Sequence, residues 1–153
     1  MTSFTAATEI DVDRPIADVW AVVADYERDP EWRDGVVGMS PSAPGPVRPG
    51  TTTAEELHMG GDVWRNRGVV DAVEPGRFFV WHTTEGAQAH GDRRLTPLAD
   101  GRTRVFMSIT VTEPALETLG DEVVDGLRDA LQQAVTGDGA RLHALLIGIS
   151  VSA

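Results

Sequence analysis

The 153-residue sequence contains no cysteine and no lysine, and Tyr26 is its single tyrosine. The absence of cysteine excludes a disulfide framework, a thiolate nucleophile and a cysteine-ligated metal site. No apolar run approaches the roughly 20 residues that span a bilayer. The segment 1–13 is acidic and does not have the basic, then apolar, pattern of a signal peptide. We therefore expect a cytoplasmic protein that does not insert into a membrane.

Positive charge is also scarce, because 13 arginines face 24 acidic residues and the net charge is -11. Such a field repels nucleic acid and anionic membranes, so we expect no nucleic-acid partner. Hydrophobic residues make up 41% of the chain and charged residues 24%, as in ordinary globular proteins. The length suits one domain over residues 1–153. The arginine-, alanine- and glycine-rich usage resembles that of high-GC bacteria and favours a bacterial source.

The first part of the chain predicts a strand followed by a helical corner. Apolar and polar residues alternate from Phe4 to Val12, which is the period of a strand with one wet face. Residues 16–24 then have helical spacing, and 29–32 can form a second short helical turn with proline near its start. We expect Trp20 and Trp32 to be structural residues of this corner.

The middle of the chain predicts an antiparallel meander. Four of the nine prolines fall in residues 41–50, which we therefore expect to be a loop inside the domain. Short glycine- or proline-containing turns separate the strands expected after it. These strands are 51–59, 62–73, 77–85, 87–97 and 103–113.

The last part of the chain predicts one long amphipathic helix. Its apolar face is formed by Leu119, Val123, Leu127, Leu131, Val135, Leu142, Leu145, Leu146 and Ile149. Gly137-Asp138-Gly139 interrupts this pattern, and we expect a kink or break there because glycine weakens a helix interior. The element order defines an α+β fold in which a curved antiparallel sheet wraps around the C-terminal helix. The uncovered concave part of such a sheet leaves a pocket, the candidate functional region.

Several motifs, together with the element order, carry a resemblance to a known family. They are Asp13 to Trp20, Asp25 to Trp32, Pro75 to Trp81 and Asp100 to Val105. In this order and at these distances they resemble the polyketide cyclase/dehydrase and lipid-transport branch of the START/Bet v 1-like (SRPBCC) superfamily. The resemblance implies the helix-grip fold and an internal cavity for a small hydrophobic molecule of polyketide-like, aromatic or lipid character. It implies no cofactor and no metal.

Three functions are compatible with these features. The first is a cyclase or dehydratase acting on a polyketide-like or aromatic precursor, and the second is a non-catalytic carrier or sensor of a hydrophobic ligand. The third is a protein-interaction domain with an exposed apolar surface. Family members that act on polyketides take them from acyl carrier proteins. Because those partners are acidic, docking would need a basic patch, which only the arginine-rich middle strands could supply. Monomer and homodimer both remain open.

The candidate acid-base or ligand-orienting residues lie on the predicted strands. They are His82, His90, Arg65 and Arg93, with Arg67 as a further arginine that could turn inward. An arginine turned into the cavity would have to pair with an acid or with a ligand oxyanion. His58, His82 and His90 fall on different predicted strands and could converge in a pocket, but the four histidines show no metal-site spacing and can equally be structural or surface residues. His143 is expected at the solvent edge of the final helix. Glu55 and Glu56 are adjacent on a strand, hence on opposite faces, and cannot form a carboxylate dyad.

The candidate ligand-binding residues are the aromatic and flexible side chains opposite the long helix. They are Trp64, Trp81, Met59, Met107, Leu142 and Leu146. Trp81 and His82 are adjacent on one strand and point to opposite faces of the sheet. Only one of them can therefore border the cavity unless a bulge intervenes. The inward face of 62–73 stays open, because Val69, Val70, Ala72 and Val73 are apolar on both faces.

Overall fold

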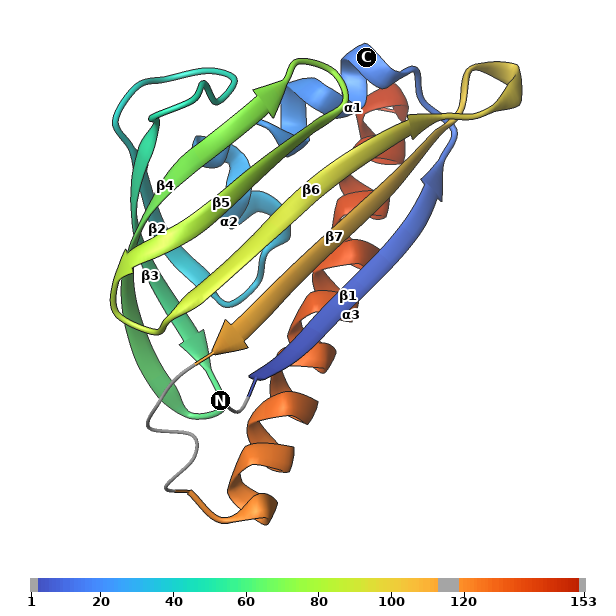
Figure 1. The fold of residues 1–153 in the computed structure, drawn as a ribbon. Helices are drawn as coiled ribbons and strands as arrows, with labels where there is room; N and C mark the ends of the chain where they lie inside the picture. The colour runs from blue at the N-terminus through green and yellow to red at the C-terminus, as the bar shows by residue number, and fades with distance from the viewer. Residues whose placement is uncertain (1–2, 113–118, 152–153) are drawn as a thin grey trace.

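The computed structural model describes residues 3–112 and 119–151, and they form a curved seven-stranded sheet with a long helix across its concave side (Figure 1). Neighbouring strands are antiparallel throughout, in the order β1-β7-β6-β5-β4-β3-β2. The strands are β1 (Ser3–Val12), β2 (Val36–Pro41), β3 (Thr52–Met59), β4 (Asp62–Glu74), β5 (Phe78–Glu85), β6 (Ala89–Pro97) and β7 (Thr103–Thr112). The α+β helix-grip prediction is confirmed.

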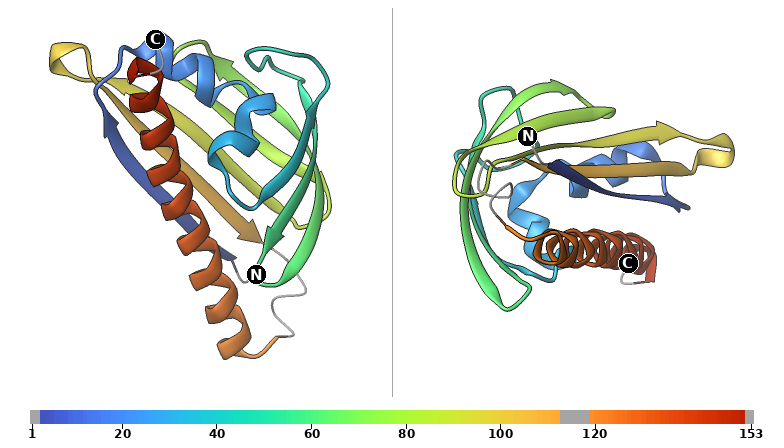
Figure 2. Two further views of the ribbon diagram at one scale, coloured as in Figure 1. Left: turned by 180° about the vertical axis from the view of Figure 1, so that it is seen from behind. Right: turned by 60° about the horizontal axis from the view of Figure 1, so that its bottom comes forward.

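The helical corner follows β1 directly. It consists of α1 (Ile16–Val23), a single 3-10 turn at Tyr26–Arg28 and α2 (Asp29–Trp32). The Asp25 carboxylate accepts a hydrogen bond from the Glu27 amide at 3.1 Å, which starts the 3-10 turn, and Pro30 lies in the first turn of α2, where proline is tolerated. Figure 2 shows the corner beside α3 (Asp121–Val151), at the end of the sheet opposite the β3–β4 hairpin.

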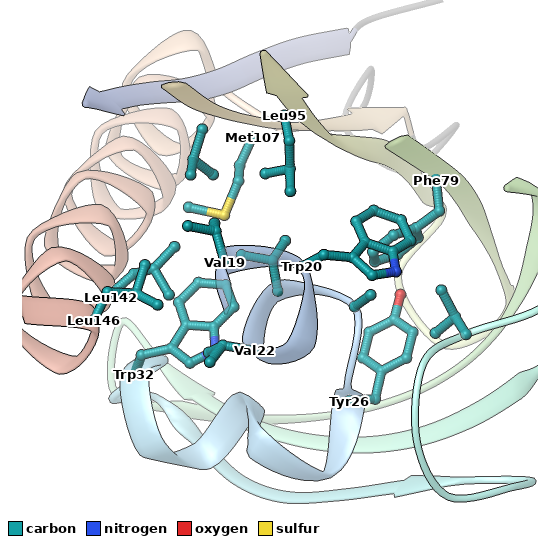
Figure 3. Close-up of a cluster of buried hydrophobic side chains, with 14 of the residues drawn as sticks. Val19, Trp20, Val22, Tyr26, Trp32, Phe79, Leu95, Met107, Leu142 and Leu146 are labelled. Carbon is teal, nitrogen blue, oxygen red and sulfur yellow. The ribbon is translucent and has the colours of Figure 1, made fainter. Parts of the chain in front are cut away.

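The main hydrophobic core joins the corner to the sheet (Figure 3). The edge of the Trp20 ring meets Phe79 with centroids 6.3 Å apart, and Tyr26 meets Phe79 at 5.6 Å. Trp20 and Trp32 are both buried in this cluster, as expected for structural residues of the corner. A second, smaller cluster of Phe4, Ala6, Val124 and Leu131 lies towards the start of α3.

The strand bounds agree with the predicted ones to within one or two residues, but one strand was not predicted. β2 is short, contains Gly38 and has a register shift between Val36 and Gly38, so its apolar pattern is too brief to recognise. Residues 42–51 form the expected loop, and the Val47 amide donates to the Ala24 carbonyl oxygen at 2.9 Å, which ties the loop to the corner.

Of the kink or break predicted at Gly137-Asp138-Gly139, the break is wrong, because α3 runs through these residues without interruption. A Cβ atom on Gly139 would lie 3.0 Å from Oγ1 and 3.1 Å from Cγ2 of Thr8. The glycine therefore lets α3 approach β1 closely. Leu119 and Val123 are exposed rather than on the buried face, which runs instead through Val124 and Leu131. Ile149 lies in α3, but its side chain is outside the described residues.

Candidate functional site: an internal cavity with one charged wall

A cavity of about 540 Å³ lies between α3 and the concave face of the sheet. It borders both hydrophobic clusters, so the interior is not one continuous core. Voids in ordinary protein interiors rarely exceed a water molecule, whereas small-molecule sites measure roughly 300–1,000 Å³. This volume falls within the range of small-molecule sites and is larger than an ordinary packing defect.

Most of the lining is apolar or aromatic. Trp64 and Trp81 project from β4 and β5, Met59 and Met107 from β3 and β7, and Leu127 from α3. The indole nitrogen of Trp64 donates to the Met59 carbonyl oxygen at 3.3 Å, which fixes the ring near the β3–β4 hairpin.

A bulge in β4 decides which of its side chains point inward. Val70 pairs with Trp81 and Ala72 with Val80, so that Asp71 is an extra residue in the ladder. Val70 is therefore buried together with Trp81, and Val73 faces the core with Phe79 on the other side of the bulge. Val70 and Val73, which strict alternation would place on opposite faces, thus both point inward, whereas Ala72 is exposed.

Gly91 on β6 provides the space for the Trp81 ring. A Cβ atom on Gly91 would lie 2.7 Å from Cζ2 of Trp81 and closer still to the Ser108 carbonyl oxygen. Real Cβ atoms essentially never approach that closely, so the position of the indole next to β6 depends on this glycine.

One wall of the cavity, next to Trp64, is charged, and Arg33 is its centre. Arg33 directly follows α2, and its Nη1 donates to Asp29 at 3.1 Å and to Glu55 at 3.0 Å. Its Nε lies 3.6 Å from an oxygen of Asp138 on α3. Burial lowers the pKa of the Arg33 guanidinium, but the three carboxylates outweigh burial and raise it. Arg33 is therefore a permanent cation that links the corner, the sheet and the long helix.

Asn66 extends this wall along β4. Its Nδ2 donates to Glu55 at 3.2 Å, and its Oδ1 accepts from the Ala87 amide at 3.0 Å. The second contact holds the turn between β5 and β6. Asn66 therefore has a fixed orientation beside Glu55 at the cavity surface.

Arg93 borders the cavity where the charged wall meets the main core, and its partner Asp29 lies behind it, outside the lining; both are buried. The guanidinium donates to both Asp29 oxygens and to the Val23 carbonyl oxygen, and it lies 4.9 Å from the Trp32 ring centroid and 5.0 Å from that of Tyr26. Burial lowers the pKa of Arg93, but the charge of Asp29 outweighs it and raises the pKa. Arg93 thus satisfies the expectation that an inward arginine pairs with an acid, and it remains charged.

Asp138 supplies the contribution of α3 to this wall. Its carboxylate accepts a hydrogen bond from Arg141 Nη2 at 3.1 Å, and Arg141 Nε donates to the Trp32 carbonyl oxygen at 3.2 Å. Burial raises the pKa of the Asp138 carboxyl above its ordinary value, against the opposing effects of Arg33 and Arg141.

The structure places the proposed ligand-binding residues in two groups. Trp64, Trp81, Met59 and Met107 line the cavity together. Leu142 and Leu146 do not, because they are fully buried in the main core with the corner. The expectation that this stretch of α3 borders the cavity is therefore corrected: the bordering residues come from the preceding turns, Leu127 to Asp138, and from Arg141.

The other proposed acid-base residues lie away from the cavity. His82 and His90 are exposed on the outer face of the sheet, where His82 Nδ1 lies 2.8 Å from Asp71. Arg65 is also exposed and pairs with Glu56. Strand alternation is the reason, since the inward neighbours are Trp81, Ala89 and Trp64. His58 reaches the rim of the cavity, but its side chain is exposed.

The middle-strand arginines also fail to form a free basic patch. Arg65 pairs with Glu56, Arg67 with Glu85 and Arg94 with Asp92. Each cation is thus offset by a neighbouring acid, which gives no support to docking of an acidic carrier protein on these strands.

Sequence reasoning missed most of the charged wall, namely Arg33, Asn66, Asp138 and Arg141. One signal was available, because Glu55 and Glu56 were placed on opposite faces and Glu55 is the inward one. A second signal was Asp138, an aspartate between two glycines in a segment with a helical pattern. Its partner Arg33 lies about a hundred positions away in the chain, beyond the reach of any local pattern.

The fold and the cavity define a class: a helix-grip protein whose sheet and long helix enclose an internal site. The profile of one family, described as "Polyketide cyclase / dehydrase and lipid transport", matches residues 1–146. The chain belongs to this family, within the START/Bet v 1-like (SRPBCC) superfamily. No curated protein sequence matches it.

Solved structures share the fold at low sequence identity. The Zhui aromatase/cyclase from Streptomyces sp. R1128 has a TM-score of 0.79 at 14% identity, over 95% of this chain and 94% of that one. The di-domain aromatase/cyclase StfQ of the steffimycin biosynthetic pathway has a TM-score of 0.76 at 18% identity, over 97% of this chain and 52% of that one. The protein TTHA0849 from Thermus thermophilus has a TM-score of 0.70 at 17% identity, over 93% of this chain and 99% of that one.

Two further properties bear on function. None of the helices within residues 3–112 and 119–151 is long and apolar enough to cross a membrane. Within the same residues, no group of three or more histidine, aspartate or glutamate side chains is arranged to hold a metal ion.

Proposed function

We propose that the protein binds a small, largely hydrophobic molecule in the cavity between α3 and the sheet. The observation that carries this proposal is the 540 Å³ space lined by Trp64, Trp81, Met59 and Met107, with a fixed polar wall beside them. Apolar walls with a few oriented polar groups are typical of small-molecule sites. A planar, polyketide-like or other aromatic molecule matches the two indoles best, because rings pack well against rings.

Carriage or sensing of this ligand needs nothing beyond the cavity, whereas catalysis needs a group that moves a proton. Arg93 cannot be that group, because it stays charged and is held by Asp29. His82 and His90 are on the other face of the sheet.

Cyclisation or dehydration is the second candidate, and Asp138 is the observation that favours it. Burial raises the pKa of its carboxyl, and a carboxyl with a raised pKa is suited to general acid-base work. If the protein is a catalyst, Asp138→Asn should retain ligand binding and lose turnover of a β-polyketone thioester, followed by NMR.

A fluorescence titration tests binding. Nile red, a neutral planar dye, should quench tryptophan emission of the wild-type protein and gain emission of its own. Trp64→Ala and Trp81→Ala should each weaken dye binding by roughly tenfold, the effect of losing one aromatic wall. Arg65→Ala is the control, since Arg65 neighbours Trp64 but faces outward. Absence of dye binding to the folded wild-type protein contradicts the proposal.

A further inference from the structure

The charged side chains of the cavity wall balance when Asp29, the buried ion-pair partner of Arg33 and Arg93, is counted with them. The cations are Arg33, Arg93 and Arg141, and the anions are Asp29, Glu55 and Asp138. Each side chain in this set contacts one or more others of opposite sign. The remaining charged residues at the boundary are engaged elsewhere or exposed: Arg67 pairs with Glu85, Asp92 with Arg94, and Asp34 is exposed.

This balance has a consequence for any bound molecule. An anion in the cavity would add a negative charge that no spare cation offsets, and in a partly dry interior such a charge is costly. A fatty acid or another carboxylate is therefore disfavoured. A neutral ligand leaves the balance intact.

The same wall contains both hydrogen-bond acceptors and donors, which a neutral hydroxyl group needs because it donates one hydrogen bond and accepts others. Each carboxylate oxygen of Glu55 accepts one hydrogen bond, from Arg33 at 3.0 Å and from Asn66 at 3.2 Å, and a carboxylate oxygen can accept a second. Arg33 uses Nη1 for its hydrogen bonds to acidic partners, so within the described residues its Nη2 amino group is left for a ligand oxygen. Glu55, Arg33 and Asn66 are thus neighbours at the cavity surface, one as an acceptor and two as donors.

Resting on the proposed function, we infer that Glu55, Arg33 and Asn66 bind the hydroxyl group of a neutral aromatic alcohol and that the balanced wall selects against carboxylates. Glu55 accepts a hydrogen bond from the hydroxyl group, while Arg33 and Asn66 donate to its oxygen. The apolar rings of the ligand then lie against Trp64 and Trp81, which share the inward face of β4 and β5 with Asn66.

Two probes of nearly equal shape test this inference by calorimetry at neutral pH: 2-naphthol, which is neutral, and 2-naphthoate, which is an anion. The wild-type protein should bind 2-naphthol more tightly, by about tenfold or more. Glu55→Gln leaves the wall with one excess positive charge, so it should weaken 2-naphthol binding, strengthen 2-naphthoate binding and remove most of the preference.

The matched control is Glu56→Gln, the next residue of β3, whose carboxylate faces outward beside Arg65 and which should leave the preference unchanged. Asp138→Asn removes a negative charge from the same wall on a different element, and it should shift the preference in the same direction as Glu55→Gln. If Glu55→Gln does not fold, the change in preference is measured with Asp138→Asn instead.

The outcomes separate this inference from the proposed function. Equal wild-type affinities for the two probes, or a preference unmoved by both charge deletions, overturn the inference while Nile red binding still supports a ligand cavity. Failure of the folded wild-type protein to bind Nile red or either naphthalene overturns both.

Discussion

The Arg93 guanidinium on β6 holds both carboxylate oxygens of Asp29 on α2, with nitrogen–oxygen distances of 2.9 and 2.7 Å. Neither residue reaches solvent appreciably, and the rings of Tyr26, Trp32 and Phe79 surround the cation. The pair is therefore a buried clamp between the helical corner and the sheet, and Arg93 borders the cavity.

Breaking this clamp from one side should destabilise the protein strongly. Arg93→Met leaves the Asp29 charge buried, with Arg33 as its remaining ion-pair partner among the described residues, and should lower the free energy of unfolding by about 3–5 kcal/mol. Urea unfolding measures it. Arg104→Met, which removes an exposed pair with Asp11, is the control and should change stability little.

A double variant distinguishes the clamp from a simple loss of packing. Asp29→Leu combined with Arg93→Met removes both charges and should recover part of the loss, because neither is then left unpaired. If the double variant is less stable than Arg93→Met by the full effect of a second independent defect, the clamp is not the source of the stability.

Two glycines that lie two residues apart in α3 should respond oppositely to alanine. A Cβ atom on Gly137 meets only the Arg141 side-chain end, at 3.3 Å, which is free to move. Gly137→Ala should therefore stabilise the helix by up to about 1 kcal/mol. Gly139→Ala places a methyl group 3.0 Å from Thr8 and should be the less stable of the two. Melting temperatures measured side by side decide this, and the reverse order would contradict close packing of α3 on β1.

The raised pKa of Asp138 predicts a pH dependence of stability. The folded state holds this proton more tightly than the unfolded chain, whose carboxyl has the ordinary pKa of 3.8. The contribution of Asp138 to stability is therefore greatest below that value and declines as the pH rises through the folded-state pKa. Asp138→Asn removes the decline, so the stability of the variant relative to wild type should increase with pH over this window.

Urea unfolding at a series of pH values measures this difference. Asp129→Asn is the control, because Asp129 is exposed on the same helix. A variant-minus-wild-type difference that stays flat, or falls, between pH 3.8 and neutral pH would show that the Asp138 pKa is not raised.

The fold could be predicted from the sequence because its signals are local. Strands such as 62–73 and 103–113 are bounded by glycine and proline turns, and the C-terminal helix has a long apolar period. β2 was not predicted, because a short strand that contains Gly38 and a register shift has almost no alternation of apolar and polar residues. The break predicted in α3 was wrong because tertiary contact with β1, rather than helix propensity, explains Gly139.

The site was only partly predictable, because its geometry depends on pairing between distant residues. Trp64 and Trp81 could be proposed as a pair, but the bulge at Asp71 that orients β4 leaves no mark in a run of valines and alanines. Arg33 meets Asp138 only in the folded chain. Leu142 and Leu146 share the apolar stripe of α3, and the stripe alone does not tell which of its turns faces the cavity and which the core.

Filling the cavity tests most directly whether it is a ligand site. Ala134 lies on α3 at the cavity surface, and Ala134→Phe should occupy the space that a ligand would take. Ala144→Phe, exposed on the same helix, is the control. In a Nile red titration of the three proteins, binding to wild type and to Ala144→Phe, with loss of binding to a folded Ala134→Phe, is the result we predict. Undiminished binding to Ala134→Phe would contradict the account, because the dye would then be bound elsewhere.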